Sequence, residues 1–141
     1  MYRIYSTGPV ENAAGNASTN VWVKVLNVSS KTKVEVEIKA YKLNGTKTEI
    51  DKASFTVRPN SSDFAIFDIT NITEYELQIQ VKNSKSALVS VWGKDSNADL
   101  VASQRFTQKE LNIIFEGPKL KSLSPTAQNS RKINSAVRRN R

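Results

Sequence analysis

The chain of 141 residues contains no cysteine and no histidine. Without cysteine there are no disulfides, no thiolate nucleophiles and no cysteine metal sites. Without histidine there is no Ser-His-Asp triad, no imidazole base and no zinc site of the usual kind. These two absences exclude most hydrolases and most metalloenzymes, and we expect no cofactor and no catalytic residue.

Long hydrophobic runs are missing as well. The longest apolar stretches have only a few residues, which is too short to cross a bilayer, so we expect no transmembrane segment. The first residues, MYRIYSTGPVENAAGN, lack the apolar stretch of a secretory signal peptide. We therefore expect a protein that is intracellular at synthesis, or one whose leader is not part of this sequence.

Acidic residues are absent from the end of the chain. Residues from Pro118 onward include seven lysines and arginines and no Asp or Glu, which leaves only +1 of the formal charge of +8 for Met1–Gly117. Such a segment is typical of a disordered tail or of a short basic helix that forms on a polyanion. Such a tail would bind nucleic acid, teichoic acid or anionic lipid headgroups, and a tail that only increases solubility is the alternative. The candidate residues are Lys119, Lys121, Arg131, Lys132, Arg138, Arg139 and Arg141.

What is present is a strong period of two. Residues 33–41 (KVEVEIKAY) alternate apolar and charged side chains, which indicates a strand with one buried face. Asn44-Gly45 follows and predicts a type I′ hairpin turn, because both central residues of that turn need a positive φ. Residues 63–69 (DFAIFDI) are apolar on both faces, as in a strand that is buried on both sides.

Seven to nine short strands are predicted in all, with turns every eight to twelve residues and no helical period before the tail. The strands are expected at residues 2–5, 21–28, 33–41, 49–57, 63–69, 75–81, 87–93, 100–106 and 111–115. The fold class is therefore all-β, a single antiparallel β-sandwich of jelly-roll or immunoglobulin-like topology. We expect an N-terminal strand and linker in 1–20, the sandwich domain in 21–117 and the basic tail in 118–141.

Five sequence blocks together resemble a group of small, mostly uncharacterised proteins of spore-forming Gram-positive bacteria, over roughly Arg3 to Phe115. They are YSTGPVEN, VWVKVLNVSS, YKLNGTKTEI, FTVRPNSSDFAIFDI and ALVSVWGKDSNADLVASQRFTQKEL. The body is also similar in size and shape to the jelly-roll subunits of endospore appendage fibres, although those use N-terminal cysteines that this chain lacks. The resemblance implies a structural role at the cell or spore surface and no site residue.

Two acidic patterns are candidates for chemistry. Asp95, Asn97 and Asp99 alternate like the first half of a calcium loop, but Leu100 and Phe106 stand where the loop needs Gly and Glu, so a polar hairpin turn is the favoured interpretation. Carboxylates could also act in pairs, as in glycoside hydrolysis. The pairs are Asp63 with Asp68 and Glu35 with Glu37, which solvent-facing positions on strands explain equally well.

Aromatic residues offer a binding alternative. Trp22, Trp92, Tyr41 and Tyr75 could stack on sugars or bases, although aromatic residues in a sandwich more often belong to the core. The best ligand-binding candidates are Trp22, Lys24 and Tyr41, because Trp22 shares a strand face with Lys24.

These patterns favour a non-enzymatic structural or surface protein that forms homo-oligomers or fibres, or docks, through its strand edges. The first candidate for a strand donated to a neighbouring subunit is Tyr2–Tyr5. The alternatives are a carbohydrate-binding module, and a polyanion- or nucleic-acid-associated protein that acts through the basic tail.

Overall fold

A computed structural model describes residues 1–120 of the chain. The strands are β1 (Tyr2–Ser6), β2 (Val10–Glu11), β3 (Asn20–Asn27), β4 (Val34–Leu43), β5 (Lys47–Val57), β6 (Ser61–Asp68), β7 (Glu74–Lys82), β8 (Ala87–Lys94), β9 (Leu100–Phe106) and β10 (Asn112–Gly117). Two short 3-10 turns, η1 (Ser84–Ser86) and η2 (Gln108–Glu110), interrupt them. In the described part of the chain no helix is long and apolar enough to span a membrane.

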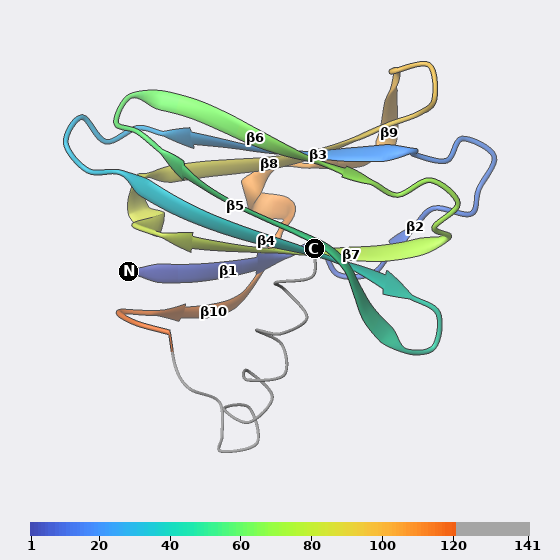
Figure 1. Ribbon diagram of the computed structural model, residues 1–141, viewed down its shortest axis with the longest axis horizontal. Helices are drawn as coiled ribbons and strands as arrows, with labels where there is room; N and C mark the ends of the chain where they lie inside the picture. Colours follow the sequence, from blue (N-terminus) through green and yellow to red (C-terminus); the bar gives the residue numbers. More distant parts are fainter. Residues whose placement is uncertain (121–141) are drawn as a thin grey trace.

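The strands form two sheets that lie face to face (Figure 1). Sheet A has the order β10-β1-β7-β4-β5, with β2 paired to β7, and sheet B has the order β6-β3-β8-β9. Every pair of neighbouring strands is antiparallel. The prediction of an all-β antiparallel sandwich is confirmed.

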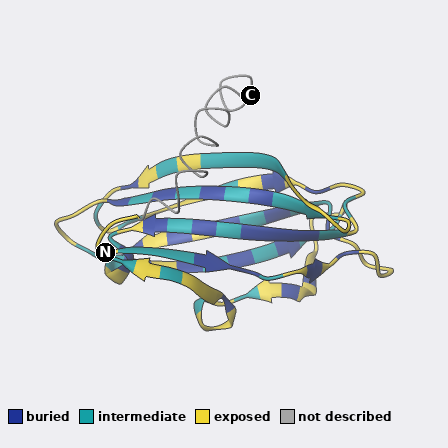
Figure 2. Cartoon of the chain, turned by 90° about the horizontal axis from the view of Figure 1, so that it is seen from below, coloured by how far each residue is buried: buried dark blue, intermediate teal, exposed yellow. Residues whose placement is uncertain are grey.

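Side-chain alternation positions the core between the sheets. Along β4, Val34, Val36 and Ile38 are buried, whereas the intervening residues are partly exposed, as the period of two predicted. β3 and β7 alternate in the same way, and Figure 2 shows the resulting bands of buried and accessible residues along the strands. The inner faces of both sheets contribute to one apolar core.

The N-terminal segment differs from the expectation of a donated strand. β1 lies inside sheet A, paired to β7 on one side and to β10 on the other, and Tyr2 is opposite Gly117. Both edges of Tyr2–Tyr5 are thus occupied by strands of the same chain. The buried side chain of Tyr5 is part of the core and fixes the strand in this position. The first 20 residues contribute β1 and β2 to the sandwich.

The first hairpin is where it was predicted, but its turn is of another kind. Three residues, 44–46, connect β4 to β5, and of these only Gly45 has a positive φ, +89°. A type I′ turn needs a positive φ at two central residues, so that assignment is wrong.

β6 also differs from its prediction. It is an edge strand with one neighbour, β3, and only its Phe67 side faces the core. The alternate residues Phe64 and Ile66 are 48% and 47% exposed, so the strand is not buried on both faces. Apolar side chains on both faces of this strand therefore mark an exposed apolar surface.

A buried polar network holds residues 9–20 against the sandwich. The Gln104 side chain on β9 accepts hydrogen bonds from Ser18 Oγ (2.7 Å) and Tyr75 Oη (2.8 Å), and its amide donates to Asn12 Oδ1 (2.7 Å). Asn12 in turn donates to the carbonyls of Ser18 and Ile72. Because every member is satisfied, the network fixes three distant chain segments in one place.

We expect a substitution beside this network to destabilise the fold. A Cβ atom at Gly93 would lie 2.5 Å from Ser18 Oγ and 3.0 Å from the Gln104 side chain. Gly93→Ala should therefore lower the free energy of unfolding by about 1–3 kcal/mol, because the buried hydrogen bonds must shift. Urea denaturation measures this. Gly15→Ala is the matched control, since a Cβ there meets nothing within 4 Å; equal midpoints for the two variants would contradict the expectation.

Candidate functional site

The outer face of sheet B carries a cluster of exposed large hydrophobic side chains. Because Val21, Val23 and Val25 of β3 point into the core, the residues between them point outward with their cross-strand partners. We call this surface the aromatic face; it comprises Trp22, Leu26, Phe64, Ile66, Leu88 and Trp92. Four of these, Leu26, Phe64, Ile66 and Leu88, are between 43% and 51% exposed.

Strand register arranges the face in rows. Trp22 lies between Ile66 of β6 and Trp92 of β8, and Trp92 is opposite Arg105 of β9. In the next row Phe64 is opposite Lys24. The row beyond it pairs Leu26 with Leu88, and the row at the other end holds Asp68, Asn20 and Lys94. Two tryptophans, apolar side chains and three cations therefore lie on one side of one sheet.

Trp22 is held between two neighbours. Its ring stacks on Phe64, with centroids 5.0 Å apart and an interplanar angle of 22°, and Lys94 Nζ lies 3.9 Å from the ring centroid. Phe64 is opposite Lys24 and Lys94 is opposite Asn20, so the two belong to the rows on either side of the Trp22 row. The indole N–H donates to Asn20 Oδ1 at 2.7 Å. The contacts with Phe64, Lys94 and Asn20 thus hold the ring in place.

The other cations also lie over indole rings. Lys24 Nζ is 5.7 Å from the Trp22 centroid, which agrees with the expectation that these two residues share a face. Arg105 Cζ is 5.9 Å from the Trp92 centroid, and the Trp92 N–H donates to Ser90 Oγ at 2.8 Å. Cation–π contacts of this kind hold the charged groups beside the apolar patch.

A shallow, open groove of about 470 Å³ runs beside Trp22 and Ile66, with Thr19, Asn20, Asp68 and Thr70 on its polar side. The Thr70 hydroxyl and then the Thr70 backbone N–H donate to Asp68, which lowers the pKa of that carboxyl. Asp68 is therefore an anion at neutral pH, at the corner of a face whose other charged groups are cations.

Tyr41 does not join this site. It lies on β4 in sheet A, on the outer side of that sheet, whereas Trp22 and Lys24 lie on the outer side of sheet B. The prediction of one ligand platform made of Trp22, Lys24 and Tyr41 is wrong, because the two outer faces are separated by the core. Lys47 Nζ lies 4.4 Å from the Tyr41 ring. Burial, and next the charge of Glu49, raise the pKa of Tyr41 to about 12. Tyr75, the other aromatic candidate, is a core residue.

The carboxylate pairs do not converge either. Asp63 is opposite Val25, whose side chain faces the core, whereas Asp68 is opposite the outward-facing Asn20, so the two carboxylates leave β6 on opposite sides. Glu35 and Glu37 share the outer face of sheet A, where they lie 3.6 Å from Lys82 Nζ and 3.5 Å from Lys52 Nζ.

The acidic loop is a hairpin turn in the structure. Asp95 Oδ1 accepts hydrogen bonds from the backbone N–H groups of Asn97 (2.9 Å) and Asp99 (3.0 Å). Within residues 1–120 no group of three or more acidic side chains is arranged to hold a metal ion.

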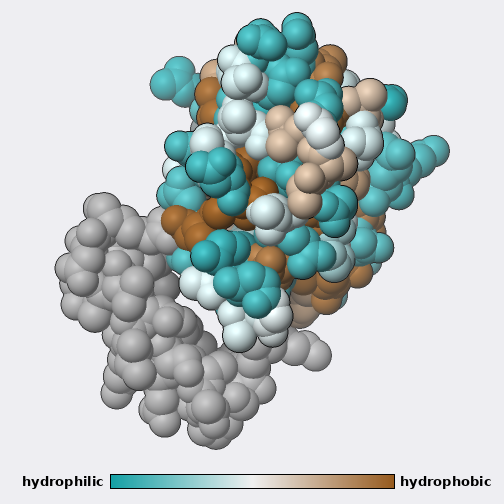
Figure 3. All heavy atoms as spheres, turned by 90° about the vertical axis from the view of Figure 1, so that its right-hand side faces the viewer, coloured by the Kyte–Doolittle hydropathy of each residue, from teal (hydrophilic) through white to brown (hydrophobic). Residues whose placement is uncertain are grey.

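The end of the sandwich that carries this turn and the 44–46 hairpin is turned toward the viewer in Figure 3, where hydrophilic residues surround smaller hydrophobic areas.

The predicted polyanion-binding residues lie almost entirely outside the described part of the chain. Lys119 is described and follows β10, whereas Lys121, Arg131, Lys132, Arg138, Arg139 and Arg141 lie outside residues 1–120. Polyanion binding by the tail stays a prediction.

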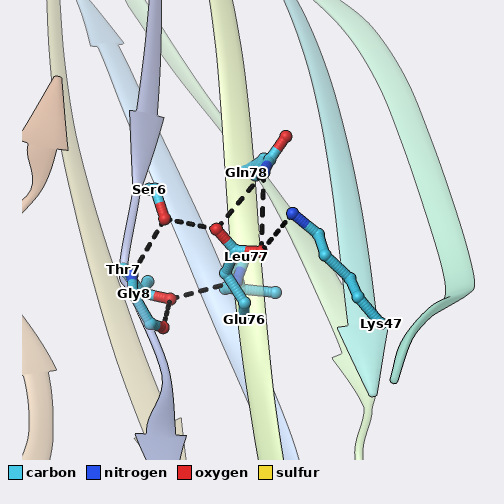
Figure 4. A network of polar contacts seen from close by, with 7 residues as sticks. All are labelled: Ser6, Thr7, Gly8, Lys47, Glu76, Leu77 and Gln78. Atoms are coloured by element: carbon cyan, nitrogen blue, oxygen red, sulfur yellow. Dashed lines mark hydrogen bonds and ion pairs between the residues drawn. The ribbon is translucent and has the colours of Figure 1, made fainter. Parts of the chain in front are cut away.

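The outer face of sheet A holds a polar network that sequence patterns did not reveal (Figure 4). Glu76 of β7 is 8% exposed and is approached by Lys47 Nζ at 2.8 Å, Gln78 Nε2 at 3.2 Å and the Ser6 hydroxyl. Burial raises the pKa of Glu76, but the contacts with Lys47, Ser6 and Gln78 outweigh it, so the pKa lies below the ordinary 4.5. The alternation of β7 predicted that Glu76 faces outward. Its carboxylate is buried nevertheless, because Lys47 of β5 and Ser6 of β1 lie over it.

The lowered pKa of Glu76 makes the stability of the fold depend on pH. Its ionised form is favoured in the folded state, so this contribution is present above the unfolded pKa and is lost as pH falls through the folded pKa. Glu76→Gln should cost about 1–2 kcal/mol at pH 7, because hydrogen bonds to a charged group are lost and Lys47 is partly exposed. The difference from the wild type should shrink as pH falls below about 4.5. Thermal melts across this range test it, with Glu74→Gln on the same strand as control. A difference that is constant with pH would contradict the assignment.

Comparisons with known proteins do not assign the chain to a family. No protein-family model matches the sequence, and no curated protein matches it. Among solved structures, the Anabaena sensory rhodopsin transducer is similar with a TM-score of 0.40 and 14% identity, over 62% of this chain and 90% of the transducer. The crystal structure of Thermotoga maritima 1070 is similar with a TM-score of 0.47 and 9% identity, over 84% of this chain and 97% of that one. With identities and scores this low, neither similarity bears on what this chain binds or does.

Proposed function

We propose that the protein is a non-enzymatic structural protein that associates with further copies of itself through a strand edge of sheet A. The observation that carries the proposal is β10. In the described part of the chain this strand has one neighbour, β1, and Ile113 and Ile114 on it are 53% and 52% exposed. An open edge with apolar side chains is a template for pairing with another chain.

Two other edge strands, β5 and β6, carry more charged residues than β10. β5 includes Lys47, Glu49, Asp51 and Lys52, and β6 carries Asp63 and Asp68. The only charged residue of β10 is Glu116, and it is engaged by Arg3 of the neighbouring β1. Charged residues on an edge discourage pairing, so β10 is less protected by charge than β5 and β6.

The geometry of pairing separates two kinds of assembly. Two β10 strands that pair with each other form a closed dimer with two-fold symmetry. A fibre needs β10 to pair with a different edge of the next copy, because only a head-to-tail contact continues without closing. Electron microscopy of the purified chain distinguishes the two.

The non-enzymatic part of the proposal is supported by how the acidic side chains are used. Glu76 is bound by Lys47 and Ser6, and Asp63 and Asp68 point to opposite sides of β6. Among residues 1–120, every buried side-chain N or O atom has a hydrogen-bond partner. Glu76 is thus engaged in structural contacts, and Asp63 and Asp68 lie apart from each other.

Placing a charge on the edge should break the association. Ile114→Lys places a cation on β10, and pairing with another chain would have to remove this cation from water at a cost in free energy. Ile114 is half exposed, so the fold should tolerate the change. Light scattering is expected to give oligomers for the wild type and monomers for this variant.

Leu88→Lys on the outer face of sheet B is the matched control, because Leu88 is 51% exposed and lies away from the edge. It should leave the oligomer intact. A wild-type chain that stays monomeric at high concentration, or an Ile114→Lys variant with the wild-type mass, would refute the proposal.

A further inference from the structure

The aromatic face is an exposed apolar surface that the edge association of β10 does not cover. Leu26, Phe64, Ile66 and Leu88 are each about half exposed and are brought together by the register of β3, β6 and β8. Trp22 and Trp92 fill the centre of the same surface. Contiguous apolar patches of this kind mark surfaces that bind a protein or a membrane.

Cations frame the patch. Lys24, Lys94 and Arg105 all lie within 6 Å of an indole centroid on this face. In the rows that the register defines, the one carboxylate among the described residues is Asp68, at a corner. A partner with negative charge and an apolar layer is therefore complementary to this surface, both in charge and in hydropathy.

Two other occupants fit less well. A second copy on a two-fold axis would bring Lys24, Lys94 and Arg105 against the same cations, and like charges across an interface are unfavourable. A sugar or a base stacks on an aromatic ring, but the Trp22 ring already stacks on Phe64 and has Lys94 Nζ 3.9 Å from its centroid. The half-exposed aliphatic side chains of Ile66 and Leu88 also have no role in stacking.

We propose that the aromatic face docks onto the surface of an anionic lipid bilayer. Indole rings favour the interface between headgroups and acyl chains, since one part of the ring is apolar and the N–H is polar. The aliphatic side chains would enter the boundary of the acyl region, while the three cations contact anionic headgroups. The seven basic residues from Lys119 to the end of the sequence have the same sign of charge and would add to the attraction.

The tryptophan fluorescence of the chain itself can test this proposal. Its only two tryptophans are Trp22 and Trp92, and both belong to the aromatic face. The full-length chain is titrated with vesicles of phosphatidylglycerol and phosphatidylcholine in equal parts, and with vesicles of phosphatidylcholine alone. Tryptophan emission and co-sedimentation are measured in parallel. We expect a shift of emission to shorter wavelength with the anionic vesicles, weakened by salt.

Two variants separate charge from apolar insertion. Each basic residue near an anionic membrane contributes a factor of about five in affinity, so Lys24→Gln/Lys94→Gln/Arg105→Gln should weaken binding on the order of a hundredfold. The control Lys31→Gln/Lys85→Gln/Lys109→Gln removes the same charge at exposed positions outside the face and should bind far more tightly than that variant. Ile66→Ser/Leu88→Ser should melt near the wild-type temperature, because both residues are half exposed, and should lose most of the emission shift.

Several outcomes would overturn the proposal. Sedimentation with vesicles without an emission shift would mean that the tail or another surface binds. Equal binding to neutral vesicles, or equal weakening by the two triple variants, would remove the role of the three cations. Quenching by a single-stranded oligothymidylate at lower concentrations than the vesicles would identify nucleic acid as the ligand instead.

Discussion

The contact between the inner faces of the two sheets is the constraint on which the rest of the structure depends. Once Val21, Val23 and Val25 of β3 are buried against sheet A, every second residue of that strand must point outward. The register of β3 with β6 and β8 then fixes which side chains of those two strands point outward. The residues that fill the core therefore determine the outer face of sheet B.

The two outer faces meet this constraint in different ways. On sheet A the outward side chains of β4 and β7 form ion pairs and hydrogen bonds, with Glu76 at the centre of one network and Glu37 paired to Lys52. On sheet B the outward side chains are largely apolar, and Lys94 and Arg105 lie over aromatic rings. This asymmetry gives the molecule one outer face of paired polar groups and one outer face of apolar side chains with cations over its indole rings.

The strands were predictable because alternation is a local signal, and the nine strands expected from the sequence are all present with ends shifted by a few residues. The position of a strand within a sheet is not local, which is why the apolar β6 was predicted to be buried and is an exposed edge. The same limit explains Tyr41, whose strand could not be assigned to sheet A or B from its pattern. Lys24 was placed beside Trp22 correctly, since two residues two positions apart on one strand share a face in any sheet. Lys94 and Arg105 come from later strands, so only the register brings them to the tryptophans.

The place of β1 between β7 and β10 has a consequence for how the chain acquires its structure. Among the described strands β1 is synthesised first and pairs with the last, β10, and the contact of Tyr2 with Gly117 spans nearly the whole sandwich. Sheet A therefore cannot be completed until β10 has been synthesised, and one side of β1 is unpaired throughout that time. The cost of closing such long loops makes folding slow, and an unpaired strand exposes a growing chain to wrong partners. The side chain of Gln104, which secures Asn12 and Ser18, also emerges late, so the N-terminal segment is held in place only when synthesis of the sandwich is almost finished.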